Sequence, residues 1–324
     1  MTAQSHTIRT PDREGVLRAA EKIAAILPPT PLLPLEIDGR TIWCKAESLQ
    51  PIGAFKIRGA WHRLSDLSEA ERAGGVVAFS SGNHAQGIAW SARRLGMTAT
   101  IVMPADAPQA KVDATRALGA TVVTYDRMTE SREAISAKLA DEHGAILVPS
   151  FDDPWVVEGQ GSAAIEAADQ LEAMTGKRPT RMVICCGGGG LASGCALALL
   201  DAQITVVEPE GWDDFGESLR QGHIVPVGPN PPPTRCDALQ TLRIAPLTFD
   251  ILHGRGATGV AVTEAEVAAA MRLAMTSLGL VLEPGGAVAL AAVLAGKAQV
   301  DGTTVITLSG RNVDLPTYAA MIGA

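Results

Sequence analysis

Four consecutive glycines, Gly187 to Gly190, constrain the fold of this chain more than any other feature. They follow a strand-like apolar run at 181–185 and precede a helical stretch at 196–200. Glycines at the start of a helix let bare backbone amides curl around a phosphate group, whereas close packing of a strand on a helix explains only one or two of them. The order of strand, glycine loop and helix predicts an α/β fold with an anion-binding loop.

The same region also fits a dinucleotide-binding motif. Gly187, Gly189 and Ala192 match the pattern G-x-G-x-x-A. Glu208 lies 21 positions after Gly187, at the end of the apolar run 204–207. A dinucleotide fold places its ribose-binding acid at this point. Taken alone, this segment suggests NAD as the cofactor of an oxidoreductase.

Strand-like runs alternate with helical stretches along most of the chain. One series of apolar, β-rich runs lies at 75–79, 98–103, 121–125 and 146–150. A second series begins near Thr180, with strands expected at 204–207 and 304–308 and a helix expected at 263–278. This alternation is typical of open parallel sheets covered by helices.

The composition limits the partners and the compartment of the protein. With 324 residues, of which 47% are hydrophobic, the chain can bury one large core or two moderate ones. A net charge of −8 without a basic cluster argues against nucleic acid or an anionic membrane as a partner. Because its first residues are polar and no apolar run reaches ~18 residues, we expect neither a signal peptide nor a membrane span. The five cysteines match no paired zinc spacing, so we expect reduced thiols in a cytoplasmic protein.

Lys56 is the best candidate for a covalent cofactor anchor. It stands between Phe55 and Ile57, just after a Pro/Gly turn, and should begin a helix in partly apolar surroundings. Burial disfavours the ammonium form and makes the amine available as a Schiff-base nucleophile. The alternative is a lysine whose stem covers apolar surface while its head stays in water.

A polar turn follows the strand expected at 75–79. It contains Ser80, Ser81, Gly82, Asn83 and His84 and precedes an apolar-periodic stretch at 88–95. The free amides at the start of this helix favour an anion, so a substrate carboxylate could bind there with help from Ser80 and Asn83. An ordinary N-cap is the alternative, but five polar or glycine residues exceed what one cap needs.

Five segments occur in the same order as in pyridoxal-phosphate enzymes of fold type II. These segments are 51–60, 80–87, 187–190, 283–287 and 308–314. The chain resembles the threonine dehydratase and serine racemase branch of that superfamily. The resemblance implies two open parallel-sheet domains, as in the tryptophan synthase β fold. Residues 1–70 and 150–324 would form a large cofactor-binding domain, and residues 71–149 a small substrate-binding domain.

The resemblance also implies roles for individual residues. Lys56 would hold pyridoxal phosphate as a Schiff base and, once freed, remove the α proton of the substrate. The cofactor phosphate would be bound by Gly187, Gly188, Gly189 and Gly190. Asn83 would bond the ring hydroxyl, and Ser309 would meet the pyridine nitrogen unless it is only a strand-end cap. A neutral hydroxyl there makes the ring a weaker electron sink, which suits elimination better than transamination.

The substrate carboxylate would be bound by Ser80, Ser81, Gly82, Asn83 and His84. Ser81 would face the substrate opposite Lys56 and could move a proton on that second face, or simply bind the carboxylate. His84 is expected to orient the turn rather than to transfer protons. Glu283 would lie near the cofactor ring, or only be an acid at the start of a helix.

The segment 208–214 resembles the divalent-cation site of the racemase branch. Glu208 and Asp214 resemble its two carboxylate ligands, and the backbone carbonyl of Trp212 would be a third. Such hard oxygen ligands, completed by water, suit magnesium or calcium. Asp214 can equally cap a helix that begins at Phe215.

Two departures from the family pattern bear on the substrate. Ala54 stands where many relatives have serine, and Arg311 replaces the second glycine of the common Ser-Gly-Gly-Asn pattern. Near the cofactor, the Arg311 guanidinium could bind a second carboxylate of the substrate, although it could also point to solvent.

The leading expectation is therefore a homodimeric dehydratase that converts L-threonine or L-serine to a 2-oxo acid and ammonia. The alternatives are 3-hydroxyaspartate dehydration and racemisation of serine or aspartate. A non-catalytic protein that binds pyridoxal phosphate would not need the intact set of Lys56, Ser81, Asn83 and Ser309.

Overall fold

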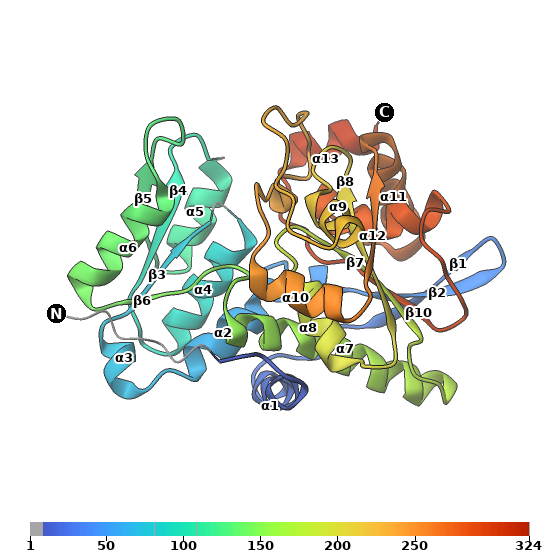
Figure 1. Ribbon diagram of the computed structural model, residues 1–324, viewed down its shortest axis with the longest axis horizontal. Helices are drawn as coiled ribbons and strands as arrows, with labels where there is room; N and C mark the ends of the chain where they lie inside the picture. The colour runs from blue at the N-terminus through green and yellow to red at the C-terminus, as the bar shows by residue number, and fades with distance from the viewer. Residues whose placement is uncertain (1–8, 81, 108, 324) are drawn as a thin grey trace.

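The computed structural model describes residues 9–80, 82–107 and 109–323, which are organised by two sheets (Figure 1). The six-stranded sheet has the order β1 (Leu32–Ile37), β2 (Arg40–Lys45), β10 (Thr304–Thr307), β7 (Arg181–Cys185), β8 (Gln203–Pro209) and β9 (Thr258–Val262). The four-stranded sheet has the order β5 (Thr121–Tyr125), β4 (Ala99–Pro104), β3 (Val76–Phe79) and β6 (Ile146–Leu147).

The helices cover both sheets. Those before the glycine loop are α1 (Arg13–Ala24), η1 (Glu47–Leu49), α2 (Lys56–Ser65), α3 (Glu69–Ala73), α4 (Asn83–Arg94), α5 (Gln109–Ala117), α6 (Arg132–His143) and α7 (Pro154–Thr175). Those after it are α8 (Gly190–Ala198), α9 (Asp214–Gln221), η2 (Asp237–Leu239), α10 (Pro246–Gly254), α11 (Glu264–Leu278), α12 (Pro284–Leu294) and α13 (Leu315–Ile322). Within the described ranges, none of these helices has the length and apolar character needed to cross a membrane.

Two lobes are visible in Figure 1. The small lobe, at left, consists of β3 to β6 with α3 to α6. The large lobe, at right, contains the six-stranded sheet and the helices from α8 onward. The helix α2 contacts α4 of the small lobe and also α7, so it lies where the two lobes meet.

Local sequence signals set the helix boundaries. α7 begins after Asp153, whose side chain caps the first turn, with Pro154 at the first helical position. It ends at Thr175, and the C-cap residue Gly176 has a φ of 72° that glycine adopts readily. α11 begins with a capping box formed by Thr263 and Glu266, which satisfies free backbone amides. The helix predicted at 263–278 is confirmed by α11.

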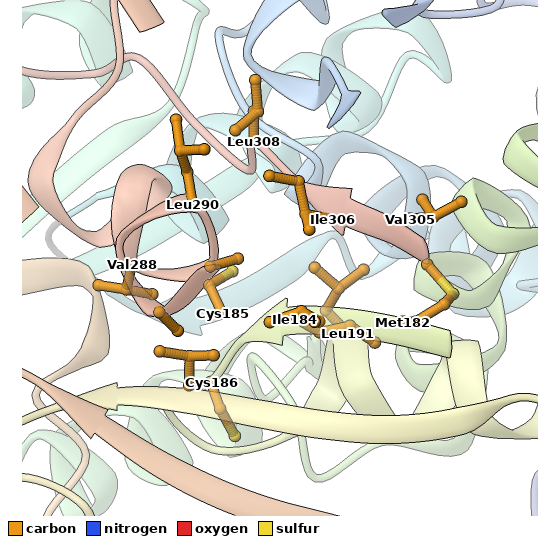
Figure 2. Close-up of a cluster of buried hydrophobic side chains, with 14 of the residues drawn as sticks. Met182, Ile184, Cys185, Cys186, Leu191, Val288, Leu290, Val305, Ile306 and Leu308 are labelled. Carbon is orange, nitrogen blue, oxygen red and sulfur yellow. The ribbon is translucent and has the colours of Figure 1, made fainter. Parts of the chain in front are cut away.

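Buried aliphatic side chains fix the large sheet against α12. Figure 2 shows Val288 and Leu290 of α12 beside Ile184 of β7 and Ile306 of β10. All four side chains are fully buried. Burial of each is worth about 1.5–3 kcal/mol, and α8 also contacts β7 and β8. The glycine loop between β7 and α8 therefore starts and ends in buried elements.

Glycines allow α2 to approach its neighbours closely. At its crossing with α7, a Cβ added to Gly159 would lie 2.5 Å from the Cα of Gly59. On the α4 side, a Cβ added to Gly87 would lie 3.0 Å from the carbonyl oxygen of Lys56. Larger residues would push α2 away, so these glycines define the position of the helix that carries Lys56.

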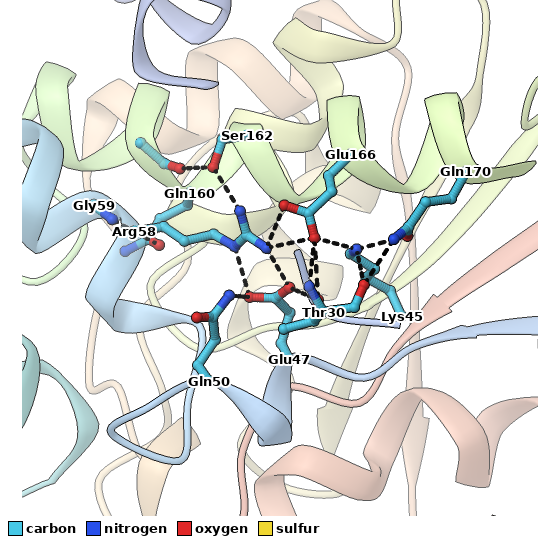
Figure 3. Close-up of polar contacts among 11 residues, drawn as sticks. Thr30, Lys45, Glu47, Gln50, Arg58, Gly59, Gln160, Ser162, Glu166 and Gln170 are labelled. Atoms are coloured by element: carbon cyan, nitrogen blue, oxygen red, sulfur yellow. Dashed lines mark hydrogen bonds and ion pairs between the residues drawn. The ribbon is translucent and has the colours of Figure 1, made fainter. Parts of the chain in front are cut away.

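A network of buried charged residues holds α2 in place through Arg58. Arg58 makes two hydrogen bonds of 2.7 Å to Glu47, one to each carboxylate oxygen (Figure 3). Its guanidinium also donates to both oxygens of Glu166, at 3.1 Å, and to the hydroxyl of Ser162, at 3.2 Å. Arg58 and Glu47 are almost completely buried, and the pairing lowers the pKa of Glu47 although burial acts in the opposite direction. Both groups are therefore held as ions.

Lys45 and Thr30 extend the network to the strands of the large sheet. The Lys45 ammonium bonds Glu166 at 2.5 Å, the Thr30 carbonyl at 2.7 Å and Gln170 at 2.8 Å. The Thr30 hydroxyl donates to Glu47 at 2.6 Å. The network thus ties α2, α7, β2 and the segment before β1 into one unit (Figure 3).

The two predicted sheets are present, with two differences in detail. All pairs in the four-stranded sheet are parallel, but β1 pairs with β2 in antiparallel fashion and makes the large sheet mixed. The antiparallel pair arises because Asp38 and Gly39, both with positive φ, turn the chain back directly after β1. The strand predicted at 146–150 ends at Leu147, and residues 148–150 instead enter the site. The division into domains at residues 70 and 150 stays a prediction.

Removal of one partner from the buried pair should destabilise the protein strongly. Arg58→Met leaves the Glu47 carboxylate buried without its main cation, at an expected cost of about 3–5 kcal/mol. Urea denaturation measures this change in the free energy of unfolding. The control, Arg127→Met, removes the exposed ion pair with Asp106 and should cost about 0–1 kcal/mol. Equal losses for the two variants would contradict the prediction.

Candidate active site

The carboxyl ends of strands from both sheets supply the candidate site. The turn that begins at Ser80 follows β3, and Ser150 lies shortly after β6. In the large lobe, the glycine loop follows β7 and Ser309 lies two residues after β10. Open α/β sheets generally bind ligands beyond these strand ends. The contacts described below join these segments across the two lobes.

Backbone hydrogen bonds hold the Lys56 segment against the end of β10. The amide of Phe55 donates to the Ser309 carbonyl at 3.1 Å, and the amide of Arg311 donates to the Gly53 carbonyl at 2.8 Å. Gly53 has a φ of 76°, and a Cβ there would lie 2.5 Å from the side-chain oxygen of Asn312. The turn before Lys56 therefore requires glycine and fixes the lysine beside Ser309.

Lys56 is positioned as a nucleophile at the start of α2. Its ammonium donates to the carbonyl of Ser150 at 2.7 Å. Burial lowers the pKa of Lys56 to about 8, and the nearby Cys185 and Cys186 oppose this shift. A substantial fraction of the amine is therefore neutral near pH 8, as a Schiff-base nucleophile requires.

Packing accounts for more of the glycine run than the sequence suggested. A Cβ on Gly188 would lie 2.2 Å from the ring of Phe151, and Gly190 has Phe151 atoms at 3.1 Å. Gly189 combines a φ of 85° with a Cβ position 2.3 Å from the ring of Phe215. The expectation that close packing explains only one or two of the four glycines was therefore wrong.

The loop nevertheless has the features of an anion site. α8 begins at Gly190, so the first amides of this helix have no intrahelical partner and its positive end faces the loop. The hydroxyl of Thr248 donates to the Gly188 carbonyl at 2.8 Å and fixes the loop from behind. Phe151 follows Ser150 directly, so one segment contacts both the Lys56 amine and the glycine loop.

The polar turn is the start of α4. The hydroxyl of Ser80 accepts a hydrogen bond from the amide of Gly82 at 3.2 Å. Gly82 is the N-cap residue of α4, and among the described residues no side-chain hydrogen bond caps this helix. Its first amides are therefore free to bind an anion. Ser81 lies outside the described residues.

His84 anchors the turn in the small lobe. Its Nε2 lies 2.9 Å from the carbonyl of Val148 and must carry the proton, since a carbonyl oxygen only accepts. Burial lowers the pKa of His84 to about 3, and the charge of Lys56 acts in the same direction. The ring is neutral at physiological pH, which agrees with an orienting rather than a proton-transferring residue.

Asn83 connects the small lobe to two residues of the large lobe. Its side-chain amide donates to Glu283 at 2.6 Å, and its oxygen accepts a hydrogen bond from Asn312 at 2.6 Å. Asn312 also donates to the Ile52 carbonyl at 2.9 Å. Burial raises the pKa of Glu283 to about 7. The start of α4 is thus tied to the segment that precedes Lys56.

Ser309 and Arg311 follow β10 but differ in their surroundings. Ser309 is buried, and its hydroxyl approaches the thiol of Cys185 at the end of β7. Arg311 is half-buried, and its guanidinium donates to the carbonyl of Ser48. Among the described residues, this is the partner found for the Arg311 side chain, and its contact with a substrate stays a prediction.

Glu208 and Asp214 form a second acidic site at the end of β8. Glu208 is fully buried and accepts hydrogen bonds from the amides of Phe215, at 3.1 Å, and Gly216, at 2.8 Å. Neither buried oxygen of Asp214 meets a partner at normal hydrogen-bond geometry, although the amide of Ile244 moderates its pKa. Burial raises the pKa of Asp214 to about 7 and that of Glu208 well above its usual range.

The helix predicted to begin at Phe215 begins one residue earlier, at Asp214, so this residue does not cap it. The indole of Trp212 donates to the Pro232 carbonyl at 2.8 Å, which fixes the turn between Glu208 and Asp214. The described residues contain no cluster of three or more His, Cys, Asp or Glu side chains that could hold a metal. A cation here would need backbone carbonyl and water ligands as well.

Comparison with known proteins identifies the family. Residues 23–310 match the model of the pyridoxal-phosphate dependent enzymes. The chain belongs to this family. It is 44% identical to the L-threo-3-hydroxyaspartate ammonia-lyase of Pseudomonas sp, over 95% of this chain and 97% of that protein. It is 36% identical to the serine racemase of Schizosaccharomyces pombe, over 97% of this chain and 98% of that protein. The structure of maize serine racemase matches with a TM-score of 0.88 and 31% identity, over 97% of this chain and 98% of that one.

Membership of the family resolves two alternatives left open by the sequence. The protein is an enzyme that uses pyridoxal phosphate, so the dinucleotide interpretation of the glycine loop no longer applies. The Glu208 carboxylate is buried and engaged with the start of α9, which leaves no exposed oxygen for a ribose. A lysine with a lowered pKa, a free helix start and the buried Ser309 together suit the cofactor's aldehyde, phosphate and ring.

The rate at which the apoprotein binds pyridoxal phosphate should follow the titration of Lys56. Only the neutral amine attacks the aldehyde, so the rate should rise about tenfold per pH unit below the pKa and level off above about 8. Stopped-flow absorbance measures the rate, with N-α-acetyl-lysine as a matched amine. Lys56→Ala should show no such phase. A midpoint near the ordinary lysine pKa would contradict the burial of this amine.

Proposed function

We propose that the protein is an ammonia-lyase that converts a β-hydroxy amino acid, foremost L-threo-3-hydroxyaspartate, to a 2-oxo acid and ammonia. The observation that carries the proposal is the Lys56 amine, which has a lowered pKa and lies beside the glycine loop. The substrate is suggested by the Pseudomonas relative at 44% identity. L-Threonine and L-serine, the leading substrates on the sequence alone, become the second candidates.

The residues of the chain divide the chemical work. Pyridoxal phosphate, when bound, supplies an electron sink that makes the substrate α proton acidic. Lys56 would anchor the cofactor and then accept that proton at its Nζ atom. The phosphate would lie on the free amides at Gly187 to Gly190, where the positive end of α8 favours an anion. The buried Ser309 hydroxyl would face the ring nitrogen without forcing its protonation.

The turn at the start of α4 would bind the substrate carboxylate. Its free amides form a site for one anion, and Ser80 and Asn83 border it. The bond of Asn83 to Glu283 uses one of the two protons on its amide nitrogen, so the other can reach the cofactor's hydroxyl. In the same proposal, residues 71–149 carry the substrate and residues 1–70 and 150–324 carry the cofactor, within a homodimer.

Racemisation is the second candidate function. The serine racemase of Schizosaccharomyces pombe supports it, with 36% identity over nearly the whole chain. A racemase needs a second proton-transfer group on the substrate face opposite Lys56, and Ser81 is the residue proposed for that place. Elimination needs only Lys56 and a leaving group, so it is preferred.

We also propose a magnesium or calcium ion at Glu208, Asp214 and the backbone carbonyl of Trp212. The fit rests on Asp214, whose two buried oxygens lack partners of normal geometry. Two buried carboxylates this close raise each other's cost of ionisation, and a hard divalent cation offsets it. The ion would stabilise the start of α9 rather than take part in the reaction.

The function is tested by assaying ammonia and 2-oxo acid release from a panel of amino acids. L-threo-3-Hydroxyaspartate should give the highest kcat/KM, followed by L-threonine and L-serine, and chiral chromatography should detect D-serine only as a minor product. Lys56→Ala should release no ammonia while remaining folded by circular dichroism. Absence of ammonia from every β-hydroxy amino acid would refute the proposal.

Arg311 is tested on the same panel. If its guanidinium also reaches the substrate, Arg311→Gly should lower kcat/KM selectively for the dicarboxylic substrate, because a charged hydrogen bond of about 1.5–3 kcal/mol is lost. If kcat/KM falls equally for all substrates, Arg311 instead supports the Lys56 segment through its hydrogen bond to the carbonyl of Ser48.

The cation should stabilise the folded protein. Magnesium or calcium at about 100 times its dissociation constant should add about 2.7 kcal/mol to the free energy of unfolding, and chelation should remove it. Asp214→Asn, which keeps the shape of the side chain, should abolish this response. If the wild type has the same free energy of unfolding with chelator as with either ion, no cation binds there and Glu208 and Asp214 are structural groups only.

A further inference from the structure

An ion pair joins the two lobes beside the candidate site. Lys111 of α5 donates to Asp237 of η2, a residue 126 positions later in the chain. The Lys111 side chain is 16% exposed and that of Asp237 is 46% exposed. In Figure 1, α5 lies on the side of the small lobe that faces the large lobe.

The 3-10 helix that contains Asp237, η2, packs against the glycine loop. A Cβ added to Gly187 would lie 3.2 Å from the Cα of Leu239, the last residue of η2. A Cβ added to Gly285 would lie 3.1 Å from the Cγ of the same leucine. η2 therefore covers both the glycine loop and the start of α12, which follows Glu283.

The Lys111 end of the pair belongs to the lobe that carries the polar turn. α5 contacts α4, the helix that begins at Asn83. A force that holds α5 against η2 therefore also holds the start of α4 against the large lobe. The hydrogen bonds that join Asn83 to Glu283 and Asn312 also cross between the lobes.

We propose that Lys111 and Asp237 form a clasp that holds the small lobe closed on the large lobe and keeps the turn at 80–84 seated at the site. Both are positioning residues, since neither needs to touch the cofactor or the reacting atoms. A partly exposed ion pair suits this use, because it is strong enough to bias two arrangements of the lobes and weak enough to open for the substrate.

The clasp is tested first without turnover, in protein loaded with pyridoxal phosphate. Asp237→Asn and Lys111→Gln should each speed amide hydrogen exchange in α4, α5 and η2 about 2- to 5-fold, the range expected for an exposed ion pair. Exchange of the charges, Lys111→Glu with Asp237→Lys, should restore most of the protection. High salt should speed exchange in the wild type but not in the single variants.

A turnover assay, which depends on the proposed ammonia-lyase activity, is the second readout. Both single variants should raise KM by a similar factor for every substrate and change kcat less, because closure is lost and not chemistry. The matched control is Asp106→Asn, which breaks an ion pair with Arg127 inside the small lobe and should behave as the wild type.

Three outcomes would overturn the clasp. The single variants could exchange like the wild type, or the charge-exchanged variant could behave as the sum of the two single changes. Lys111 could also serve the substrate directly. Lys111→Gln would then lower kcat/KM for 3-hydroxyaspartate alone, and Asp237→Asn would raise it. If no substrate is turned over, the amide hydrogen exchange measurements still test whether Lys111 and Asp237 hold the lobes together.

Discussion

The buried pair between Arg58 and Glu47 is the interaction on which the position of Lys56 depends. Arg58 lies two residues after Lys56 on α2, and its side chain is almost completely buried. A shift of the helix would separate two desolvated charges, which costs far more than a shift of apolar contacts. Glu166 of α7 accepts from the same guanidinium, so the network fixes the start of α2 relative to α7 and the segment around Glu47.

The glycines that pack against aromatic rings in the large lobe are the same ones that the proposed function assigns to phosphate binding. Phe151 and Phe215 press on Gly188 and Gly189, and side chains there would displace the rings. Because the glycines of the loop have no side chains, no side chain of the loop itself shields its backbone amides. Phe151 also follows Ser150, which accepts from Lys56, so the contacts that shape the phosphate loop also place the amine.

The sequence predicted the elements of the site better than the contacts that hold them. Strand and helix periodicity, glycine runs and ordered motifs are local, so the two sheets and the place of Lys56 at the start of a helix followed from them. Partners far along the chain could not be predicted this way. Arg58 reads as an ordinary polar position of an amphipathic helix, yet it pairs with Glu166, 108 residues later. Phe151 stands in no motif, and only the folded chain shows that it packs on Gly188.

The buried carboxylates Glu208 and Glu283 differ in the groups that offset the free-energy cost of burying a charge. Glu208 accepts hydrogen bonds from two backbone amides, whereas neither buried oxygen of Asp214 meets a partner of normal geometry, and burial raises the pKa of both carboxyls. Glu283 instead accepts from the neutral amide of Asn83, and burial raises its pKa to about 7. Below that pH the acid is neutral and the bond from Asn83 is an ordinary one. Above it the carboxylate is charged, and a charge-assisted bond holds the start of α4 more firmly. The strength of the hydrogen bond that holds the start of α4 is therefore coupled to the protonation of Glu283.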